Sequence, residues 1–225
     1  IARVHLAQKS LILTRGDQVI TYVSRNLEPY RGFHIFMRAL PEIQRRLPCA
    51  HVLIVGGDDV SYGRPSDTGT YREKYLAEVG TRVDMSRVHF LGRLPYADYL
   101  RVLQLSTAHV YLTYPFVLSW SMLEAMAAGA IVVGSKTAPV QEVIENGHNG
   151  LLVDFFSQAE LVESIAHVCE SGATMDAVRH ASMETIRERF SLRGECLSRQ
   201  LDILGVSTGS DRREAVARPV ASALP

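Results

Sequence analysis

The carboxylate of Glu124 stands one turn into a short helix that the sequence predicts over residues 121–128 and that Gly129 ends. The loop before this helix follows the strand-like run HVYLTYP, so backbone N–H groups and the positive end of the helix dipole can face an anion. A carboxylate one turn into the helix can accept hydrogen bonds from sugar hydroxyls. The anion-binding helix start and this carboxylate together indicate a nucleotide-sugar site. The spacing Ser121-x-x-Glu124 also fits a capping box, in which Glu124 only binds backbone donors.

Two arginines form a second group of candidate binding residues. Arg25 follows the apolar run VITYVS, and Arg31 stands beside Gly32 at the start of the next predicted helix. Both would lie outside the carboxyl ends of parallel strands, where open sheets of this kind bind ligands. Two guanidinium groups there could clamp a diphosphate through charge-assisted hydrogen bonds. Both could equally be surface residues, one of them paired with Glu28.

Further candidates end the next two predicted strands. Gly56 and Gly57 end HVLIVGG, where the lack of a Cβ permits a close backbone approach. They do not form a G-x-G-x-x-G fingerprint, which argues against a standard dinucleotide site. Arg93 and Leu94 follow VHFLG, and their backbone could run along a base edge or form an ordinary turn. Trp120, the single tryptophan, could pack or could donate its indole N–H to an anion.

The elements that must position these residues follow from alternating apolar runs and helical patterns. The runs are too short for buried helices and do not alternate with polar residues, as expected of strands covered on both faces. We therefore predict an α/β fold, a doubly wound parallel sheet with a helical C-terminal extension. The predicted strands are VITYVS, HVLIVGG, VHFLG, HVYLTYP, AIVVGS and GLLVD, and the predicted helices are 33–47, 71–79, 96–104, 121–128, 157–169, 175–190 and 192–204. A further helix is predicted to contain Glu142 and to end near Asn146-Gly147.

Composition excludes several classes of protein. The 225 residues carry 24 basic and 24 acidic side chains, so no bulk charge favours a nucleic-acid partner. No apolar run approaches the length of a membrane span. Cys49, Cys169 and Cys196 show no pairing pattern, which favours reduced thiols in the cytoplasm. No histidine stands at ligand spacing from another histidine or a cysteine, so we expect no metal site.

The chain divides into three parts by sequence pattern. Residues 1–16 look like a connector from something upstream, and residues 17–190 carry the strands and helices. Residues 191–225 are expected to form a helix and a flexible tail, because the tail is small, polar and weakly periodic. Residues 57–69 form a long loop rich in Gly, Asp, Ser and Pro, which we expect to be mobile or functional.

The ordered set VSRNLEPYRGF, LIVGG, VHFLGRL, LEAMAAGAIVVGS and PVQEVIENGHNGLLV resembles the nucleotide-sugar-binding C-terminal domain of the glycosyltransferase group 1 family. The resemblance covers about residues 19–190. It implies the GT-B architecture, in which two Rossmann-like domains face a cleft, and of which this chain would be the C-terminal half. It also implies cytoplasmic synthesis of polysaccharide or glycolipid, with the full-length enzyme peripherally associated with the inner face of a membrane.

The resemblance also implies roles for particular residues. Arg25 and Arg31 would bind the donor diphosphate, and Glu124 would match the second Glu of the family's E-x7-E motif, which holds the ribose hydroxyls. Arg93 and Leu94 would lie by the base. The backbone at the helix start would bind the diphosphate through Ser119, Trp120, Ser121, Met122 and Leu123. The donor would be a nucleoside diphosphate sugar, and neither a cofactor nor a metal is expected.

Two departures from the family pattern carry consequences. Phe116 stands where the first Glu of E-x7-E would face the transferred sugar, so we assign no catalytic residue. Only one Rossmann-like unit is present, so the acceptor-binding N-terminal domain would be missing and the fragment inactive in transfer. The leading hypothesis is the donor-binding domain of a hexosyltransferase-type enzyme that retains the anomeric configuration. The alternatives are a non-catalytic nucleotide-sugar-binding module, which Phe116 motivates, and a GT-B nucleotide-sugar epimerase.

Overall fold

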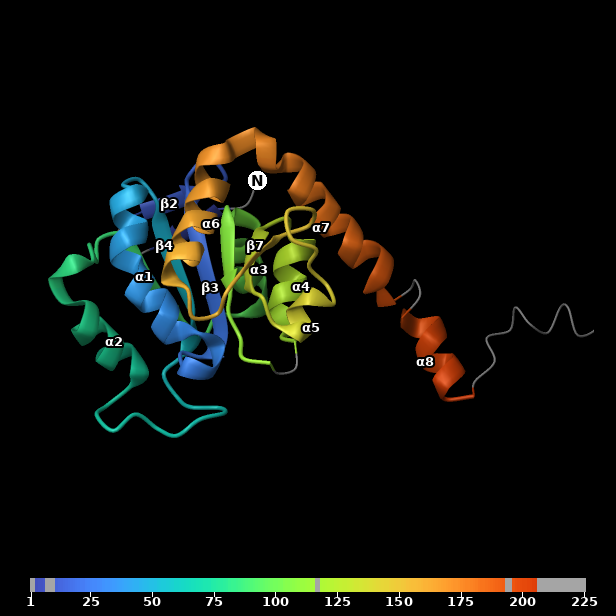
Figure 1. Ribbon diagram of the computed structural model, residues 1–225, viewed down its shortest axis with the longest axis horizontal. Helices are drawn as coiled ribbons and strands as arrows, with labels where there is room; N and C mark the ends of the chain where they lie inside the picture. Colours follow the sequence, from blue (N-terminus) through green and yellow to red (C-terminus); the bar gives the residue numbers. More distant parts are fainter. Residues whose placement is uncertain (1–2, 7–10, 116–117, 193–195, 206–225) are drawn as a thin grey trace, which may run out of the picture. The chain divides into compact units, whose positions relative to one another are not determined.

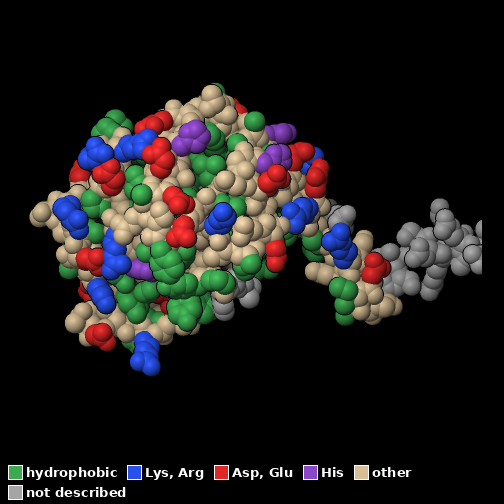
Figure 2. Space-filling view, viewed as in Figure 1, with side chains coloured by type: hydrophobic (Ala, Val, Ile, Leu, Met, Phe, Trp, Pro, Cys, Tyr) green, Lys and Arg blue, Asp and Glu red, His purple; other side chains and the backbone are tan. Residues whose placement is uncertain are grey.

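The computed structural model describes residues 3–6, 11–115, 118–192 and 196–205. Contacts divide the chain into two compact units, Ile1–Glu184 and Thr185–Pro225. The first unit holds the sheet and the candidate site. Figure 2 shows that lysine and arginine side chains are interspersed with acidic ones on its visible face, in keeping with the balanced charge of the sequence.

A six-stranded parallel sheet is the centre of the first unit (Figure 1). The strand order β5-β4-β3-β6-β7-β8 reverses direction of growth beside β3, which is the doubly wound pattern predicted from the sequence. All six predicted strands are confirmed. Their bounds are β3 Val19–Asn26, β4 His51–Gly57, β5 Val88–Gly92, β6 Ala108–Tyr111, β7 Ile131–Ser135 and β8 Leu151–Val153.

Helices cover both faces of this sheet, which explains why the strands read as unbroken apolar runs. Ile20 and Tyr22 of β3 pack in one cluster with residues of α1 (Phe33–Arg46) and α6 (Gln158–Ser171). Val19, one position earlier, faces the other side and packs with Val102 of α3 (Tyr96–Leu105). Figure 1 shows α1 and α6 lying together on one face of the sheet.

The remaining α-helices are α2 Tyr71–Val79, α4 Trp120–Ala127, α5 Ala138–Gln141, α7 Asp176–Arg189 and α8 Leu197–Ile203. The ends of α2, α4 and α7 differ little from the predicted ones, whereas α5 ends before Glu142 and not near Asn146-Gly147 as predicted. The helix predicted over 192–204 is thus observed in its second half, and residues 193–195 and the predicted tail from 206 onward lie outside the described residues. Among the described residues, no helix is both long and apolar enough to cross a membrane.

The segment predicted as a connector contains a second, two-stranded antiparallel sheet. Its strands are β1 (Arg3–Leu6) and β2 (Leu11–Thr14), and Arg3 pairs with Thr14. Leu13 of β2 is buried and packs in one cluster with Val102 and Leu105 of α3. Part of this segment therefore belongs to the first unit and contributes to its core.

Candidate functional site

Two adjoining cavities lie at the carboxyl ends of the central strands. The smaller cavity has a volume of about 270 Å³, and the larger, more open cavity has about 1160 Å³. Ser24, Arg25 and Trp120 line both, so the two cavities meet at these residues. This is the edge at which open parallel sheets bind ligands, and it is where the sequence placed the candidate residues.

The charges of the two cavities differ. Arg25 and Arg31 line the smaller cavity, and no carboxylate is among the described residues around it. The larger cavity shares Arg25 and adds Arg93, but it also contains the carboxylates of Asp59 and Glu124. The smaller cavity therefore suits an anion, whereas the larger one suits neutral groups that donate hydrogen bonds to carboxylates.

Arg31 is held in a fixed position by three tyrosines and a threonine. Its Nη1 donates to Oγ1 of Thr113 at 2.9 Å and to the hydroxyl oxygen of Tyr111 at 3.3 Å. Its carbonyl accepts from the hydroxyl of Tyr22 at 2.8 Å, and its Cζ lies 5.4 Å from the ring centre of Tyr62. These contacts fix the guanidinium in the wall of the smaller cavity, where it is preorganised for an anion.

The turn before α1 determines where Arg31 can reach. Gly32 adopts φ +70° and ends the 3-10 turn Pro29–Arg31. A Cβ on Gly32 would lie 2.3 Å from Cβ of Leu112, which no side chain tolerates. Glycine is thus required here both for its left-handed backbone and for the close packing of α1 on the end of β6.

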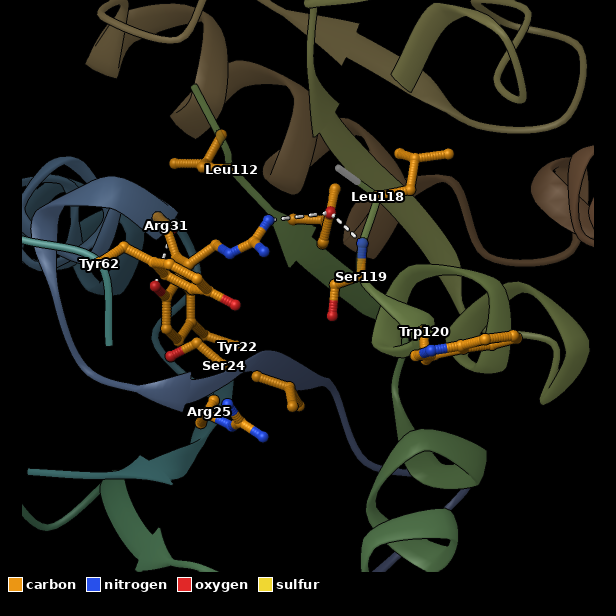
Figure 3. Close-up of a pocket in the computed structure, with 11 residues that line it drawn as sticks. Tyr22, Ser24, Arg25, Arg31, Tyr62, Leu112, Leu118, Ser119 and Trp120 are labelled. Carbon is orange, nitrogen blue, oxygen red and sulfur yellow. Dashed lines mark hydrogen bonds between the residues drawn. The ribbon is translucent and has the colours of Figure 1, made fainter. Parts of the chain in front are cut away.

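Arg25 is exposed at the junction of the two cavities. In the described part of the chain it has neither a hydrogen-bond nor an ion-pair partner, and the pairing with Glu28 considered from the sequence is absent there for Arg25. In Figure 3 the side chains of Arg25 and Arg31 both extend toward the space in front of α4. The two guanidinium groups that the sequence predicted to act together do share one cavity.

The start of α4 differs from the capping box that the sequence allowed. The N-cap is Ser119, whose Oγ accepts from the backbone N–H of Ser121 at 3.3 Å, so the N-cap lies two residues before the one that the capping box would give. The N–H of Ser119 donates to the hydroxyl of Tyr111 at 2.8 Å, and that of Met122 donates back to Ser119. Several donors predicted to face a diphosphate therefore have partners within the chain. Ser119 and Trp120 line the smaller cavity, whereas Ser121, Met122 and Leu123 line neither cavity.

Trp120 does not pack in the core. Its side chain is 79% exposed at the first residue of α4, where it lines both cavities. Gly129, at φ +82°, follows the end of the helix as predicted. The exposed indole at the junction of the cavities is a surface on which a planar or polar ligand group can rest.

Glu124 binds side chains rather than backbone donors. Its Oε1 accepts from the hydroxyl of Tyr96 at 3.0 Å and its Oε2 from that of Tyr99 at 2.7 Å. Burial, together with the bond to Glu124, raises the pKa of Tyr99, so the phenol stays protonated and donates. The carboxylate faces the larger cavity and retains lone pairs for further donors.

Arg93 spans the mouth of the larger cavity. Its Nη2 donates to Oδ1 of Asn26 at 3.0 Å and to Oδ2 of Asp59 at 2.6 Å. A Cβ on Gly57 would lie 2.7 Å from Nε of Arg93, and one on Gly56 would lie 2.8 Å from the carbonyl oxygen of Ser24. The close approach predicted for these glycines is therefore to groups of the chain itself. Leu94 lines the same cavity.

Glu28 holds the long loop after β4. Its buried carboxylate accepts from the N–H of Ser61 at 3.2 Å and from the N–H of Tyr62 at 3.1 Å. Asn26 adds a bond from Nδ2 to Oγ of Ser61 at 2.8 Å. These bonds place the ring of Tyr62 beside Arg31 in the smaller cavity. The loop that the sequence marked as mobile or functional thus forms one wall of the candidate site.

Other titratable groups lie away from the cavities. His109 is fully buried, bonds to Thr21 at 2.8 Å, and has its pKa lowered by burial to about 3. Within the described residues, no histidine lines either cavity, and no cluster of three or more His, Cys, Asp or Glu side chains could hold a metal ion. Phe116, the departure from the E-x7-E pattern, lies outside the described residues.

Sequence reasoning missed the tyrosines that organise the site. Tyr22, Tyr62 and Tyr111 surround Arg31, and Tyr96 and Tyr99 hold Glu124. The signal that could have found Tyr111 is its place at the end of a predicted strand, beside the loop into α4. The pairing of α3 with Glu124 had no local signal, because the bonded residues are 25 and 28 positions apart.

Comparisons with known proteins place the chain in a family. The family described as "Glycosyl transferases group 1" matches residues 7–185. The chain is 30% identical over 151 residues to a D-inositol 3-phosphate glycosyltransferase of Corynebacterium urealyticum, covering 66% of this chain and 34% of that protein. It thus spans about a third of the length of that curated relative.

Solved structures share the fold. Sucrose-phosphate synthase from Thermosynechococcus elongatus superposes with a TM-score of 0.71 at 23% identity, over 92% of this chain and 47% of that one. HepE from Anabaena, solved with UDP-glucose, has a TM-score of 0.64 at 22% identity, over 83% of this chain and 49% of that one. At these sequence identities the likeness concerns the fold alone. The match over most of the sequence shows that the chain belongs to the group 1 family of glycosyl transferases.

Proposed function

We propose that this chain is the donor-binding domain of a glycosyltransferase that transfers a sugar from a nucleoside diphosphate sugar to an acceptor. The observation that carries the proposal is the segregation of charge between the two cavities. Among the described residues, two arginines and no carboxylate line the smaller cavity, and Glu124 lines the larger one immediately beside it. A nucleoside diphosphate carries the matching groups in the same order, an anionic diphosphate next to a ribose with hydroxyl donors.

The diphosphate would occupy the smaller cavity and its junction with the larger one. Arg31 is held there by Tyr111 and Thr113, and Arg25, at the junction, has no ion pair among the described residues that a phosphate would have to break. Charge-assisted hydrogen bonds from two guanidinium groups would stabilise the diphosphate as the glycosidic bond to the sugar breaks. Preorganised positive groups act most strongly on charge that develops in the transition state, which is where a leaving group needs them.

The nucleoside would lie in the larger cavity. Glu124 already accepts from two phenols, so its environment suits hydroxyl donors such as those of ribose. Tyr96 is largely exposed and can move aside for a ribose hydroxyl, whereas Tyr99 is more buried and would continue to orient the carboxylate. The base would lie toward Arg93 and Leu94. The complex of HepE with UDP-glucose supports a nucleotide sugar as the class of ligand.

The whole protein would add the acceptor side of the reaction. We propose that a second Rossmann-like domain of the same protein faces these cavities, that transfer proceeds with retention, and that the 225-residue chain binds the donor without transferring its sugar. The donor chemistry assigned to this chain rests on its own arginines, tyrosines and Glu124.

Calorimetry of the 225-residue chain with UDP, GDP and ADP tests the proposal. Arg25→Ala and Glu124→Ala should each weaken the tightest of these ligands by about tenfold or more, because each removes a charged partner. Arg45→Ala is the matched control, since Arg45 is an exposed arginine of α1 that pairs only with Glu42 in the described structure. Absence of binding, or equal binding by all variants, would contradict the proposal.

A non-catalytic nucleotide-sugar-binding module is the second candidate, and Phe116 in place of the first motif Glu favours it. Both candidates require donor binding, so turnover separates them. Transfer or hydrolysis of a nucleotide sugar by the full-length protein would exclude the module. Binding without turnover, under conditions where an acceptor is supplied, would exclude the enzyme.

A further inference from the structure

One hydroxyl joins the two halves of the smaller cavity. The oxygen of Tyr111 accepts a hydrogen bond from Nη1 of Arg31 at 3.3 Å and another from the backbone N–H of Ser119 at 2.8 Å. Arg31 comes from the β3–α1 side of the sheet and Ser119 from the start of α4, which is the opposite wall of the cavity. In Figure 3 the guanidinium of Arg31 and the backbone of Ser119 face each other, and the hydrogen bonds that both donate to Tyr111 connect them.

The Tyr111 hydroxyl can still donate one hydrogen bond. A phenol has one O–H to donate, and the oxygen of Tyr111 has already accepted two bonds from N–H donors. Among the described residues, no group accepts a hydrogen bond from Tyr111, although its side chain is only 2% exposed. Tyr111 nevertheless lines the smaller cavity, so the O–H can be satisfied from there. A buried donor without an acceptor costs free energy, which a ligand oxygen in the cavity would recover.

The surroundings make this hydroxyl a good donor to an anion. Accepting a bond from a guanidinium polarises the O–H group, and hydrogen bonds in such chains strengthen one another. Burial raises the pKa of Tyr111, so the phenol keeps its proton at neutral pH and donates. An anion held by Arg31 would lie within reach of the same hydroxyl, because the guanidinium and the phenol oxygen are in direct contact.

We propose that the Tyr111 hydroxyl donates a hydrogen bond to the diphosphate of the donor nucleotide, and that its oxygen sets the distance between Arg31 and the start of α4. This inference rests on the proposed function, because it names a further ligand of the same diphosphate. It assigns to a strand-end tyrosine the contact that the sequence assigned to backbone N–H groups of α4. The N–H of Ser119 then acts on the ligand through Tyr111 rather than by direct contact.

Tyr111→Phe is the direct test, with calorimetry of the full 225-residue chain against UDP, GDP and ADP and against the corresponding nucleosides. The variant should bind the tightest of the three diphosphates about 10- to 100-fold more weakly, the usual value of a hydrogen bond to a charged group. Its affinity for the nucleoside alone should stay within about twofold of the parent chain. A general loosening of the fold would weaken both ligands alike, so the ratio of the two affinities separates the roles.

Tyr75→Phe is the matched control. Tyr75 is also buried, its hydroxyl has no hydrogen-bond partner in the described structure, and it lies outside both cavities, among the rings of α1 and α2. It should bind nucleoside and diphosphate like the parent chain. If Tyr111→Phe does not fold by circular dichroism, 3-fluorotyrosine introduced at position 111 replaces it, because that residue keeps the hydroxyl and makes it a stronger donor. Diphosphate affinity should then rise while nucleoside affinity does not.

The outcomes of these experiments distinguish a failure of the Tyr111 inference from a failure of the proposed function. Should Arg25→Ala weaken diphosphate binding while Tyr111→Phe binds within about twofold of the parent chain, only the role of Tyr111 is wrong. An equal loss for nucleoside and diphosphate would make Tyr111 a structural residue and would also overturn the proposal. If the parent chain binds none of the three diphosphates, the proposed function and this inference fail together.

Discussion

Replacing Glu28 by glutamine should release the loop that forms one wall of the smaller cavity. The buried carboxylate accepts from the N–H groups of Ser61 and Tyr62, with Oε2 to N distances of 3.2 and 3.1 Å. Hydrogen bonds to a charged group contribute about 1.5–3 kcal/mol each, against about 1 kcal/mol for a neutral pair. Gln keeps one neutral acceptor but turns an amide donor toward backbone N–H groups. We therefore expect the closed loop to lose about 2–4 kcal/mol.

Hydrogen exchange measures this change at the residues concerned. The amides of Ser61 and Tyr62 should exchange about 30-fold faster or more in Glu28→Gln, since about 1.4 kcal/mol corresponds to tenfold. The amides of Ile20 and Tyr22 in β3 should be unaffected, because they belong to the sheet. Exchange at 61 and 62 within about threefold of the parent chain would refute the role given to Glu28.

Three further predictions concern packing, titration and the carboxylate of the larger cavity. Gly32→Ala should lower the free energy of unfolding, measured in urea, by about 3 kcal/mol, because the new Cβ adds steric overlap to backbone strain. Gly147→Ala, with a similar φ of +80° and no atom within 4 Å of the new Cβ, should lower it by only about 1–2 kcal/mol. Equal losses for the two variants would contradict the overlap at Gly32. The low pKa of His109 means that the unfolded chain binds the extra proton between about pH 6.5 and 3, so stability falls as pH falls, by about 2 kcal/mol at pH 5 from this group. His109→Asn should reduce that pH slope in urea titrations, and an unchanged slope would refute the assignment. Tyr99→Phe should weaken nucleoside binding in calorimetry more than Tyr96→Phe does, since Tyr99 is the more buried support of Glu124; the reverse order would contradict the orienting role.

Most of the fold could be predicted because strands that are buried on both faces of the sheet appear in the sequence as unbroken apolar runs. The run AIVVGS reads as a strand since every residue of β7 is buried. Helix ends such as that of α4 followed from local chemistry at Gly129. The pairing of β1 with β2 had no comparable signal, because these short strands depend on packing against α3.

Site residues whose place depends on the end of one strand or helix could be predicted from the sequence. Site contacts between elements that are distant in the sequence could not. Arg25 and Arg31 follow from their places at strand and helix ends, and the structure brings both to one cavity. The sequence allowed Ser121 as the cap of α4, whereas the structure has Ser119, which is the same favoured N-cap residue type, so residue type alone cannot choose between them. The partners of Glu124 lie on α3, a contact that only the folded chain defines.

The most direct test of this account is a crystal structure of the chain with whichever of UDP, GDP or ADP binds most tightly. We predict the diphosphate within hydrogen-bond distance of Arg25 and Arg31 in the smaller cavity, with the ribose hydroxyls on Glu124 in the larger one. A nucleotide bound in the opposite direction, or outside both cavities, would contradict it.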